Sequence, residues 1–427
     1  MTKAPRHCSP AGFPGRSSPF PAGREGDRAI PAIDGPPAIV VSAQAPGLSV
    51  VRSLRRRGVH VTVATESLDE PAVGSRHASA VILTPDPATD PEGCVDALLD
   101  AIPTDQRPVV IPSGDDAICA LANDYDRLAE RCTVAGPRWP VAEWFIDKRR
   151  TMELAAKTDV PAPRSALDVD GENAASIAET LTYPVLVKPS QSHVLTRQTG
   201  VKMLAVDSPE EFIDAVRLCE EKGVAPFAQE IVPGPPGYGV NVIVYVRGEE
   251  VVADFTARKV RNWPAQWGSP CALVSERITG LEERTKRLLV EAGFEGMACA
   301  EYKFDDRCGD YQLMEVNVRH NLSGTLAQRC GVDFAWIDYA HRAGLDVGPS
   351  NPKGWFEEGV TWIDSFRDAA NLVTTGTWWR DPRAAIAPYR RPGAWAFIDP
   401  TDMKPFRRRA QQLGRRGLQR FRRNGHE

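Results

Sequence analysis

The sequence predicts a protein of mixed α/β and α+β class that includes a small parallel sheet. A buried apolar run at Pro37–Ser42, then Gly47 and a helical pattern at Leu48–Arg55, and then a second apolar run at Val59–Ala64 give a βαβ order. Two more strand patterns and a helical run extend this sheet: Ala80–Leu83, Pro108–Pro112 and roughly Val95 to Ala101. The chain of 427 residues is also long enough for two or three domains.

The loops of this predicted sheet do not carry a dinucleotide motif. The first strand is followed by Gly-x-x-x-x-Arg-x-Leu from Gly47 to Leu54, and Gly-x-Gly-x-x-Gly is missing. Asp115 and Asp116 follow the last strand, at a place where parallel sheets bind ligands. We interpret these two carboxylates first as helix N-caps and second as substrate contacts.

Two lysines and a turn come next along the chain. Lys148 begins a helical stretch directly after Asp147, and Lys188 ends the apolar strand Tyr183–Val187. A lysine on a buried strand requires an anionic partner. A phosphate would suit this lysine, and the alternative is an ion pair with an acidic side chain. The strand Phe227–Glu230 then leads into a turn that we expect to act as an interdomain hinge.

The clearest chemical pattern lies near residue 315. Glu315, Asn317 and Arg319 alternate along a predicted strand, so they share one face while Met314 and its alternating neighbours pack the other. Glu301 lies on a second short strand pattern upstream. If the two strands are antiparallel neighbours, they offer two carboxylates and an amide to Mg²⁺. The alternative is a solvated strand face with one surface ion pair.

A further strand pattern carries three cations. Alternation would direct Lys259 and Arg261 to one face and Arg258 to the other, where it would form a surface pair. We expect Lys259 and Arg261 at the site. The following stretch from 265 to 270 has the length of a loop that closes over a substrate, or of a plain turn.

These motifs, in the order Asp-Lys, strand-Lys-Pro, Gln-Glu-x-Val-x-Gly, Glu and Glu-x-Asn-x-Arg, resemble the ATP-grasp superfamily over roughly residues 38 to 345. Many members carry a glycine-rich loop after the strand lysine, but the stretch from 190 to 200 has a single glycine. In this stretch the chain resembles the branch of predicted ATP-dependent carboligases related to D-aspartate ligase. The resemblance implies a small parallel-sheet (pre-ATP-grasp) domain followed by a two-subdomain ATP-grasp fold.

The resemblance also implies an activity, a carboxylate-amine ligase that uses ATP and Mg²⁺, with Mn²⁺ as a substitute. The carboxylate would become an acyl phosphate, which an amine attacks, with release of ADP and phosphate. The implied roles are phosphate contact by Lys148 and Lys188; adenine and ribose contact by Gln229, Glu230 and Val232; metal binding by Glu301, Glu315 and Asn317; and charge stabilisation in catalysis by Arg319, Lys259 and Arg261.

We expect four segments. Residues 1–36 are rich in Pro, Gly, Ser and Arg and are predicted to be a disordered leader. Residues 37–140 form the pre-ATP-grasp domain, 141–345 the ATP-grasp domain with subdomains 141–225 and 226–345, and 346–427 a C-terminal extension. This extension ends in an arginine-rich stretch from 406 to 423, interpreted as a basic helix that contacts an acidic membrane surface or a partner protein, or as a frayed tail.

Composition is typical of a soluble cytoplasmic enzyme. The formal net charge is −4, which gives no reason to expect nucleic-acid binding. Nine cysteines occur without a Cys-x-x-Cys pair, so neither a zinc site nor a disulfide framework is indicated, and no run reaches the length of a membrane span. Two other functions remain open: a non-catalytic nucleotide-binding or scaffold protein, and an ATP-grasp enzyme with a non-amine acceptor. The two substrates and the oligomeric state are not identified by the sequence.

Overall fold

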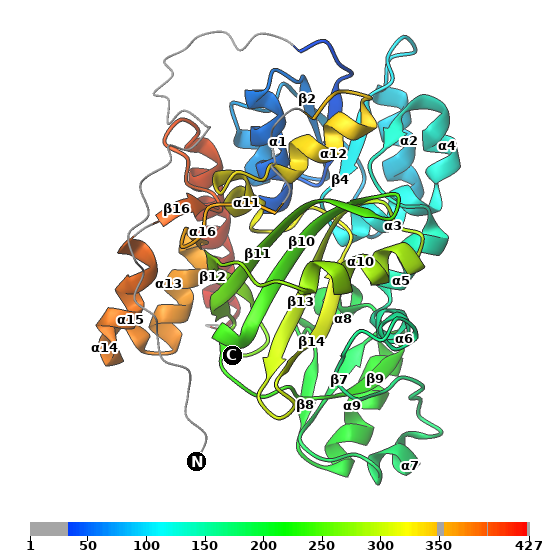
Figure 1. The fold of residues 1–427 in the computed structure, drawn as a ribbon, viewed down its shortest axis with the longest axis vertical. Coiled ribbons are helices and arrows are strands. Elements are labelled where there is room, and N and C mark those ends of the chain that lie inside the picture. Colours follow the sequence, from blue (N-terminus) through cyan, green and yellow to red (C-terminus); the bar gives the residue numbers. More distant parts are fainter. Residues whose placement is uncertain (1–32, 348–353, 391, 425–427) are drawn as a thin grey trace.

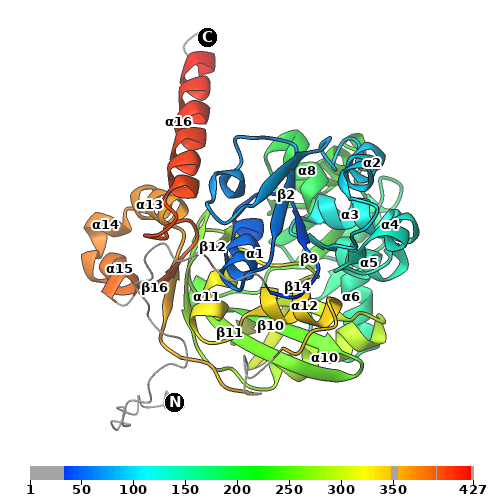
Figure 2. The same cartoon turned by 90° about the horizontal axis from the view of Figure 1, so that it is seen from above.

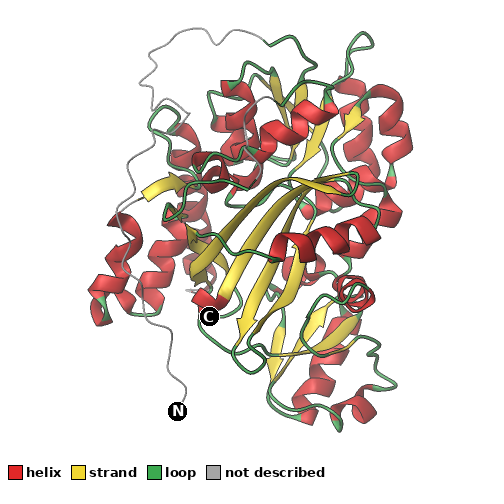
Figure 3. Ribbon diagram, viewed as in Figure 1, coloured by secondary structure: helices red, strands yellow, loops and turns green. Residues whose placement is uncertain are grey.

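The computed structural model describes residues 33–347, 354–390 and 392–424, and most of the predicted leader lies outside these residues. The described chain forms three sheets with helices packed on them (Figure 1). The parallel sheet lies at the top of Figure 1, the large sheet runs through the middle, and the third sheet lies below it. Figure 3 shows the strands of the large sheet with helices beside them.

The N-terminal sheet has the strand order β3-β2-β1-β4-β5, and every pair is parallel, as predicted. β1, β2 and β4 are mostly buried apolar runs, whereas the edge strand β3 is apolar but largely exposed. Helix α1 starts earlier than expected because Pro46 suits the first turn of a helix. The elements are β1 (Ala38–Val41), α1 (Ala45–Arg56), β2 (Val61–Thr65), η1 (Pro71–Gly74), β3 (Ala80–Leu83), α2 (Pro91–Ala101), β4 (Val109–Pro112), α3 (Asp115–Asn123), α4 (Tyr125–Arg131) and β5 (Thr133–Val134). Because β2 and β4 flank β1, a crevice opens at the carboxyl ends of these strands.

The second sheet is antiparallel and has the order β6-β9-β7-β8. Its elements and the two helices before it are α5 (Trp139–Ile146), α6 (Lys148–Lys157), β6 (Ser165–Ala166), α7 (Ala174–Ala178), β7 (Val185–Pro189), α8 (Ser192–Thr199), β8 (Leu204–Val206), α9 (Pro209–Glu221) and β9 (Pro226–Glu230). β9 pairs with β7, so the passage to the large sheet comes after Glu230 rather than at residue 226.

The stretch after Lys188 was expected to be a loop and is the helix α8 instead. No glycine or proline interrupts residues 192–199, so the helix forms and ends at Gly200, which has a positive φ of 77°. A helix N-terminus therefore follows the strand lysine.

The large sheet has the order β14-β13-β10-β11-β12-β15-β16. Alternate residues of β10 pack two cores: Ile243 and Tyr245 join the core shared with the N-terminal sheet, and Val242 and Val244 join the core under α10. The elements are η2 (Pro236–Tyr238), β10 (Gly239–Arg247), β11 (Glu250–Trp263), β12 (Ser269–Ser275), α10 (Leu281–Glu291), β13 (Gly296–Asp305), β14 (Asp310–Asn317), α11 (Gly324–Arg329) and α12 (Phe334–Arg342). The shared core holds the N-terminal sheet against the large sheet.

The C-terminal extension is part of the large sheet rather than a separate unit, because β15 pairs with β12 and β16 with β15. Its elements are β15 (Thr361–Ile363), α13 (Ser365–Thr374), α14 (Thr377–Arg380), α15 (Pro382–Ile386), η3 (Ala387–Arg390), β16 (Pro392–Trp395) and α16 (Lys404–Asn424). The arginine-rich stretch lies within α16, which stands out from the body in Figure 2. Among the described residues, no helix is long and apolar enough to cross a membrane.

Candidate functional site

A cavity of about 390 Å³ lies between the antiparallel sheet and the large sheet. Its walls come from β7, the segment after α8, the turn after β9, the loop between β11 and β12, and the facing strands β13 and β14. Of the predicted residues, it is lined by Lys188, Val232, Lys259, Glu301 and Glu315. We call this cavity the cleft.

Two carboxylates face each other on the floor of the cleft. β13 and β14 are antiparallel, and their register places Glu301 opposite Glu315 and Cys299 opposite Asn317. The predicted antiparallel neighbours are therefore present. Each carboxylate is held by a lysine from another element: Lys148 Nζ lies 2.6 Å from Glu315 Oε2, and Lys259 contacts Glu301.

A β-bulge changes the face of one residue from the expected pattern. The register shifts between Glu301 and Tyr302, since Tyr302 pairs with Leu313 while Glu301 pairs with Glu315. Met314 is the extra residue of the bulge and lines the cleft together with Glu315, whereas it was predicted to pack the opposite face. Leu313 takes that buried place instead.

A third lysine at the cleft, Lys202, was missed by the sequence analysis. Its Nζ lies 3.7 Å from Glu315 Oε2, and the Glu315 carboxylate raises the pKa of Lys202. Burial by itself raises the pKa of the Glu315 carboxyl, but Lys148 and Lys202 together bring that pKa well below its usual range. Glu315 is therefore ionised and balanced by two cations. Lys202 lies between α8 and β8, where no strand or helix pattern marked it.

Lys188 is buried on β7, with 6% of its surface exposed, and donates a hydrogen bond to Gln229. Burial, and then the charge of Lys148, lower the pKa of Lys188 to about 7. Gln229 also donates to Ser165 Oγ over 3.0 Å, so its buried side chain positions Lys188 instead of lining the cleft. The ammonium of Lys188 is thus close to losing its proton at neutral pH.

Of two other residues predicted to contact the nucleotide, Val232 lies at the cleft and Glu230 does not. Val232 lines the cleft, and its carbonyl accepts a hydrogen bond of 2.7 Å from Lys303 Nζ. Glu230 does not line the cleft, because its carboxylate pairs with Arg307 at the surface. The structure thus brings the backbone of the turn to the cleft, but not the Glu230 side chain.

The three cations of β11 are divided between the two faces of the sheet, and the prediction that Lys259 and Arg261 share one face is wrong. In the pairing with β12, Lys259 lies opposite Leu273 and Arg261 opposite Ala272, so the residue between them is bulged and the two cations face opposite ways. Arg261 Nε lies 2.6 Å from Asp368 Oδ1 of α13, in a buried pair outside the cleft.

Arg258 forms the expected ion pair, with its Nη2 lying 2.6 Å from Glu276 Oε1. Lys259 alone of the three cations reaches the cleft. Gly239 gives its chain room, since a Cβ there would lie 2.7 Å from Lys259 Cδ.

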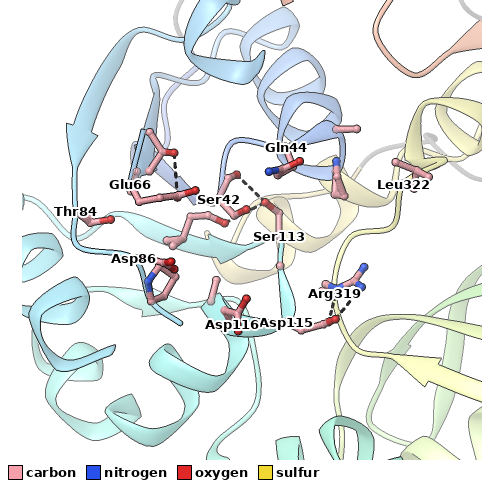
Figure 4. Close-up of a pocket in the computed structure, with 18 of the residues that line it drawn as sticks. Ser42, Gln44, Glu66, Thr84, Asp86, Ser113, Asp115, Asp116, Arg319 and Leu322 are labelled. Carbon is pink, nitrogen blue, oxygen red and sulfur yellow. Dashed lines mark hydrogen bonds and ion pairs between the residues drawn. The ribbon is translucent and has the colours of Figure 1, made fainter. Parts of the chain in front are cut away.

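A second cavity of about 370 Å³ lies at the carboxyl ends of β1 to β4 (Figure 4). Arg319 lines it, and its guanidinium pairs with Asp115, with Nη2 lying 3.2 Å from Oδ2. Asp115 is therefore an ion-pair partner of Arg319 and not the side-chain N-cap that we expected. Arg319 Nη2 also lies 3.4 Å from Asn317 Oδ1, and Ser269 lines both cavities, so the second cavity adjoins the cleft.

The comparisons with known proteins found relatives in sequence and in structure. The D-alanine–D-alanine ligase of Ectopseudomonas mendocina is 29% identical over an alignment of 209 positions, and the match covers 44% of this chain and 62% of that relative. The corresponding ligase of Pseudomonas entomophila is 24% identical over an alignment of 204 positions, and the match covers 44% of this chain and 61% of the relative. The chain thus spans less than two thirds of the length of these curated relatives. No protein-family model matches the chain.

Three solved structures have a similar fold. A biotin carboxylase from Campylobacter jejuni superposes with a TM-score of 0.59 at 14% identity, over 76% of this chain and 74% of that one. An N5-carboxyaminoimidazole ribonucleotide synthetase in complex with ADP has a TM-score of 0.61 at 15% sequence identity, and the match covers 82% of this chain and 87% of that chain. An L-amino acid ligase from Bacillus licheniformis has a TM-score of 0.57 at 15% sequence identity, and the match covers 74% of this chain and 77% of that chain. At these identities, the likeness shows a shared fold.

Proposed function

We propose that this chain, which has the ATP-grasp fold, is a ligase that uses ATP and Mg²⁺ to activate a carboxylate as an acyl phosphate and joins it to an amine, with release of ADP and phosphate. The observation that carries the proposal is the cross-strand pair of Glu301 and Glu315, each held by a lysine at the floor of the cleft. The names of the relatives, D-alanine–D-alanine ligase and L-amino acid ligase, support a ligase.

The donor set of the cleft fits Mg²⁺. Among the described residues, no group of three or more His, Cys, Asp and Glu is placed to hold a metal. Glu301 and Glu315 line the cleft and supply two carboxylates, and Asn317 would add an amide from beside Glu315, where its Nδ2 lies 3.4 Å from Glu315 Oε1. A magnesium ion bound there would complete its oxygen shell with phosphate and water. Its chemistry would be to neutralise charge on the phosphates, and Mn²⁺ has similar ligand preferences.

The lysines suit the phosphates of ATP. Lys148, Lys188 and Lys202 bring positive charge to one region around Glu315, which an ATP phosphate chain would neutralise. The backbone beside Val232 would border the adenine, and Gln229 would act by holding Lys188. The side chain of Glu230 is not part of this proposal.

Arg319 and Lys259 are the proposed catalytic cations. Arg319 lies beside Asn317 and lines the second cavity, where it would meet the carboxylate as that group takes the phosphoryl group. Lys259 would stabilise negative charge from the cleft side. Holding both reactants between the cavities would keep water from the acyl phosphate. Arg261 would serve as a structural link between β11 and α13.

The test is ADP release from ATP and Mg²⁺ in the presence of pooled carboxylates and amines, with mass spectrometry of the products. A new condensed mass that appears with ADP is expected. Glu315→Gln is expected to abolish ADP release, whereas the matched variant Glu230→Gln, outside the cleft, is expected to retain it. Full turnover of Glu315→Gln with a true substrate would exclude the proposed role.

Three finer assignments are also proposals. Lys188 to Ser192 reads Lys-Pro-x-x-Ser, which supports a relation to the carboligase branch that includes D-aspartate ligase. The arginine-rich α16 supports contact with an acidic membrane surface or a partner protein. The described cysteines are all free, which supports the cytoplasm as the compartment.

A further inference from the structure

Exposed apolar side chains gather on the helices α13, α14 and α15 of the C-terminal extension. Trp378 and Trp379 have 56% and 62% of their surface exposed, and Val373 and Ile386 are also exposed. These four are among the ten exposed large apolar residues of the described chain, although they fall within a short stretch. Figures 1 and 2 show α14 and α15 at the outer edge of the molecule. Such a concentration indicates a binding surface, and we call these four residues the tryptophan patch.

The helices that carry the tryptophan patch are fixed to the large sheet by the buried arginine of β11. The Arg261 guanidinium pairs with Asp368 of α13, and its Nη1 donates a hydrogen bond of 3.0 Å to the Ala384 carbonyl of α15. The Tyr389 hydroxyl of η3 donates a hydrogen bond of 2.6 Å to Asp368 Oδ2. One buried cluster thus joins α13, α15 and η3 to β11, so the patch stands on an ordered support.

The turn that leads into the two tryptophans is also well defined. Gly376 lies between α13 and α14 with a positive φ of 72°, and the hydroxyls of Thr375 and Thr377 form a hydrogen bond of 2.7 Å beside it. A Cβ at Gly376 would lie 3.0 Å from Trp379 Nε1, so the indole N–H edge lies against the turn. The exposure of both indoles therefore comes from a hydrogen-bonded turn.

The charges beside the tryptophan patch are mostly positive. Arg380, Arg383 and Arg390 are exposed, and none of them forms an ion pair with another described residue. The one carboxylate between residues 373 and 390 belongs to Asp381, which caps α15 by accepting a hydrogen bond of 3.0 Å from the Ala384 amide. This surface therefore combines two indole rings with a net positive charge.

We propose that the tryptophan patch and the three arginines beside it dock on an anionic lipid bilayer. An indole suits the boundary between lipid and water, because its ring is apolar and its N–H is polar. Guanidinium groups at the same depth would contact lipid phosphates and be attracted by anionic headgroups. This docking surface is separate from α16, and it does not depend on the proposed ligase function. It would hold the ATP-grasp body at a membrane surface.

The experiment is flotation of the full chain with two kinds of vesicle, one of phosphatidylcholine alone and one of equal parts phosphatidylcholine and phosphatidylglycerol. The chain is expected to float with the anionic vesicles and at least about tenfold more weakly with the neutral ones. Trp378→Ser with Trp379→Ser, and separately Arg380→Gln with Arg383→Gln, are each expected to weaken binding to the anionic vesicles at least about tenfold. Brominated lipids in the vesicles are expected to quench tryptophan fluorescence, and the double tryptophan variant should lose this quenching.

Matched control variants lie elsewhere on the surface. Trp355→Ser removes an exposed tryptophan before β15, and Arg127→Gln with Arg217→Gln removes two exposed arginines on α4 and α9. Both controls are expected to bind anionic vesicles as the unchanged chain does, and melting temperatures show whether each variant is folded. Because α16 is the same in every variant, any lipid contact of its own does not produce these differences.

Several outcomes would overturn the inference. They are no binding of the full chain to anionic vesicles, equal binding to neutral and anionic vesicles, unchanged binding by the folded double tryptophan variant, or binding without quenching by brominated lipids. A dimer of the chain that is lost in the double tryptophan variant, without vesicle binding, would also overturn it, because a second copy would then cover the patch.

Discussion

Nucleotide binding is expected to be linked to proton uptake by Lys188. The pKa of this buried lysine is lowered to about 7, so about nine-tenths of it is uncharged at pH 8 and about one-tenth at pH 6. Phosphate oxygens favour the charged form. Binding should therefore take up about 0.9 proton at pH 8 and about 0.1 at pH 6, and the binding free energy should weaken by about 1.4 kcal/mol for each pH unit above 7.

The assay is calorimetry of ADP with Mg²⁺ at pH 8, where the nucleotide phosphates are already ionised, in two buffers with different ionisation enthalpies. The difference in heat between the buffers gives the number of protons taken up. Lys188→Met should abolish the uptake, while Lys157→Met, a lysine paired with Glu291 at the surface, should retain it. No uptake at pH 8, or the same uptake in Lys188→Met, would refute the reasoning.

Three further predictions follow from the contacts. Lys202→Met should lower kcat/KM for ATP by about tenfold or more, since one balancing cation is lost, and steady-state kinetics that match Lys157→Met would contradict this. Arg261→Met should lower the free energy of unfolding in urea by about 3 kcal/mol, because Asp368 stays buried without the guanidinium. The double variant Arg261→Met, Asp368→Leu should recover most of this stability. An equal loss in the single and the double variant would argue against the ion pair. EDTA should stop ADP release, and added Mg²⁺ or Mn²⁺ should restore it. The melting temperature without nucleotide should stay constant in EDTA, because lysines already balance both carboxylates. ADP release that persists in EDTA would exclude the metal.

The parts of the site that follow regular strands could be predicted from the sequence. Period-two alternation places Glu315 and Asn317 on one face. The sequence raised the antiparallel pairing with Glu301 as a possibility, and the structure has this pairing. The parallel order of the N-terminal sheet follows in the same way from strands separated by helical runs.

The wrong predictions for this site involve features that the alternation of polar and apolar residues along a strand does not reveal. A bulged residue looks like any other strand residue in the sequence, yet it turned Met314 toward the cleft and separated Arg261 from Lys259. Arg367 and Arg409 are brought to the second cavity by contacts across hundreds of residues, which no local pattern records. Lys202 was missed because irregular segments carry no periodicity.

The pairing of β15 with β12 has a consequence for where this chain can be divided. β12 carries the buried residues Cys271 and Leu273, and β15 covers its outer backbone groups, with Trp362 fully buried opposite Leu273. A chain that stopped at the end of the recognisable ATP-grasp motifs would expose this strand as a long apolar sheet edge. Such edges recruit strands from neighbouring molecules, so the shortened protein would tend to aggregate. The unit that must be kept together therefore includes β15.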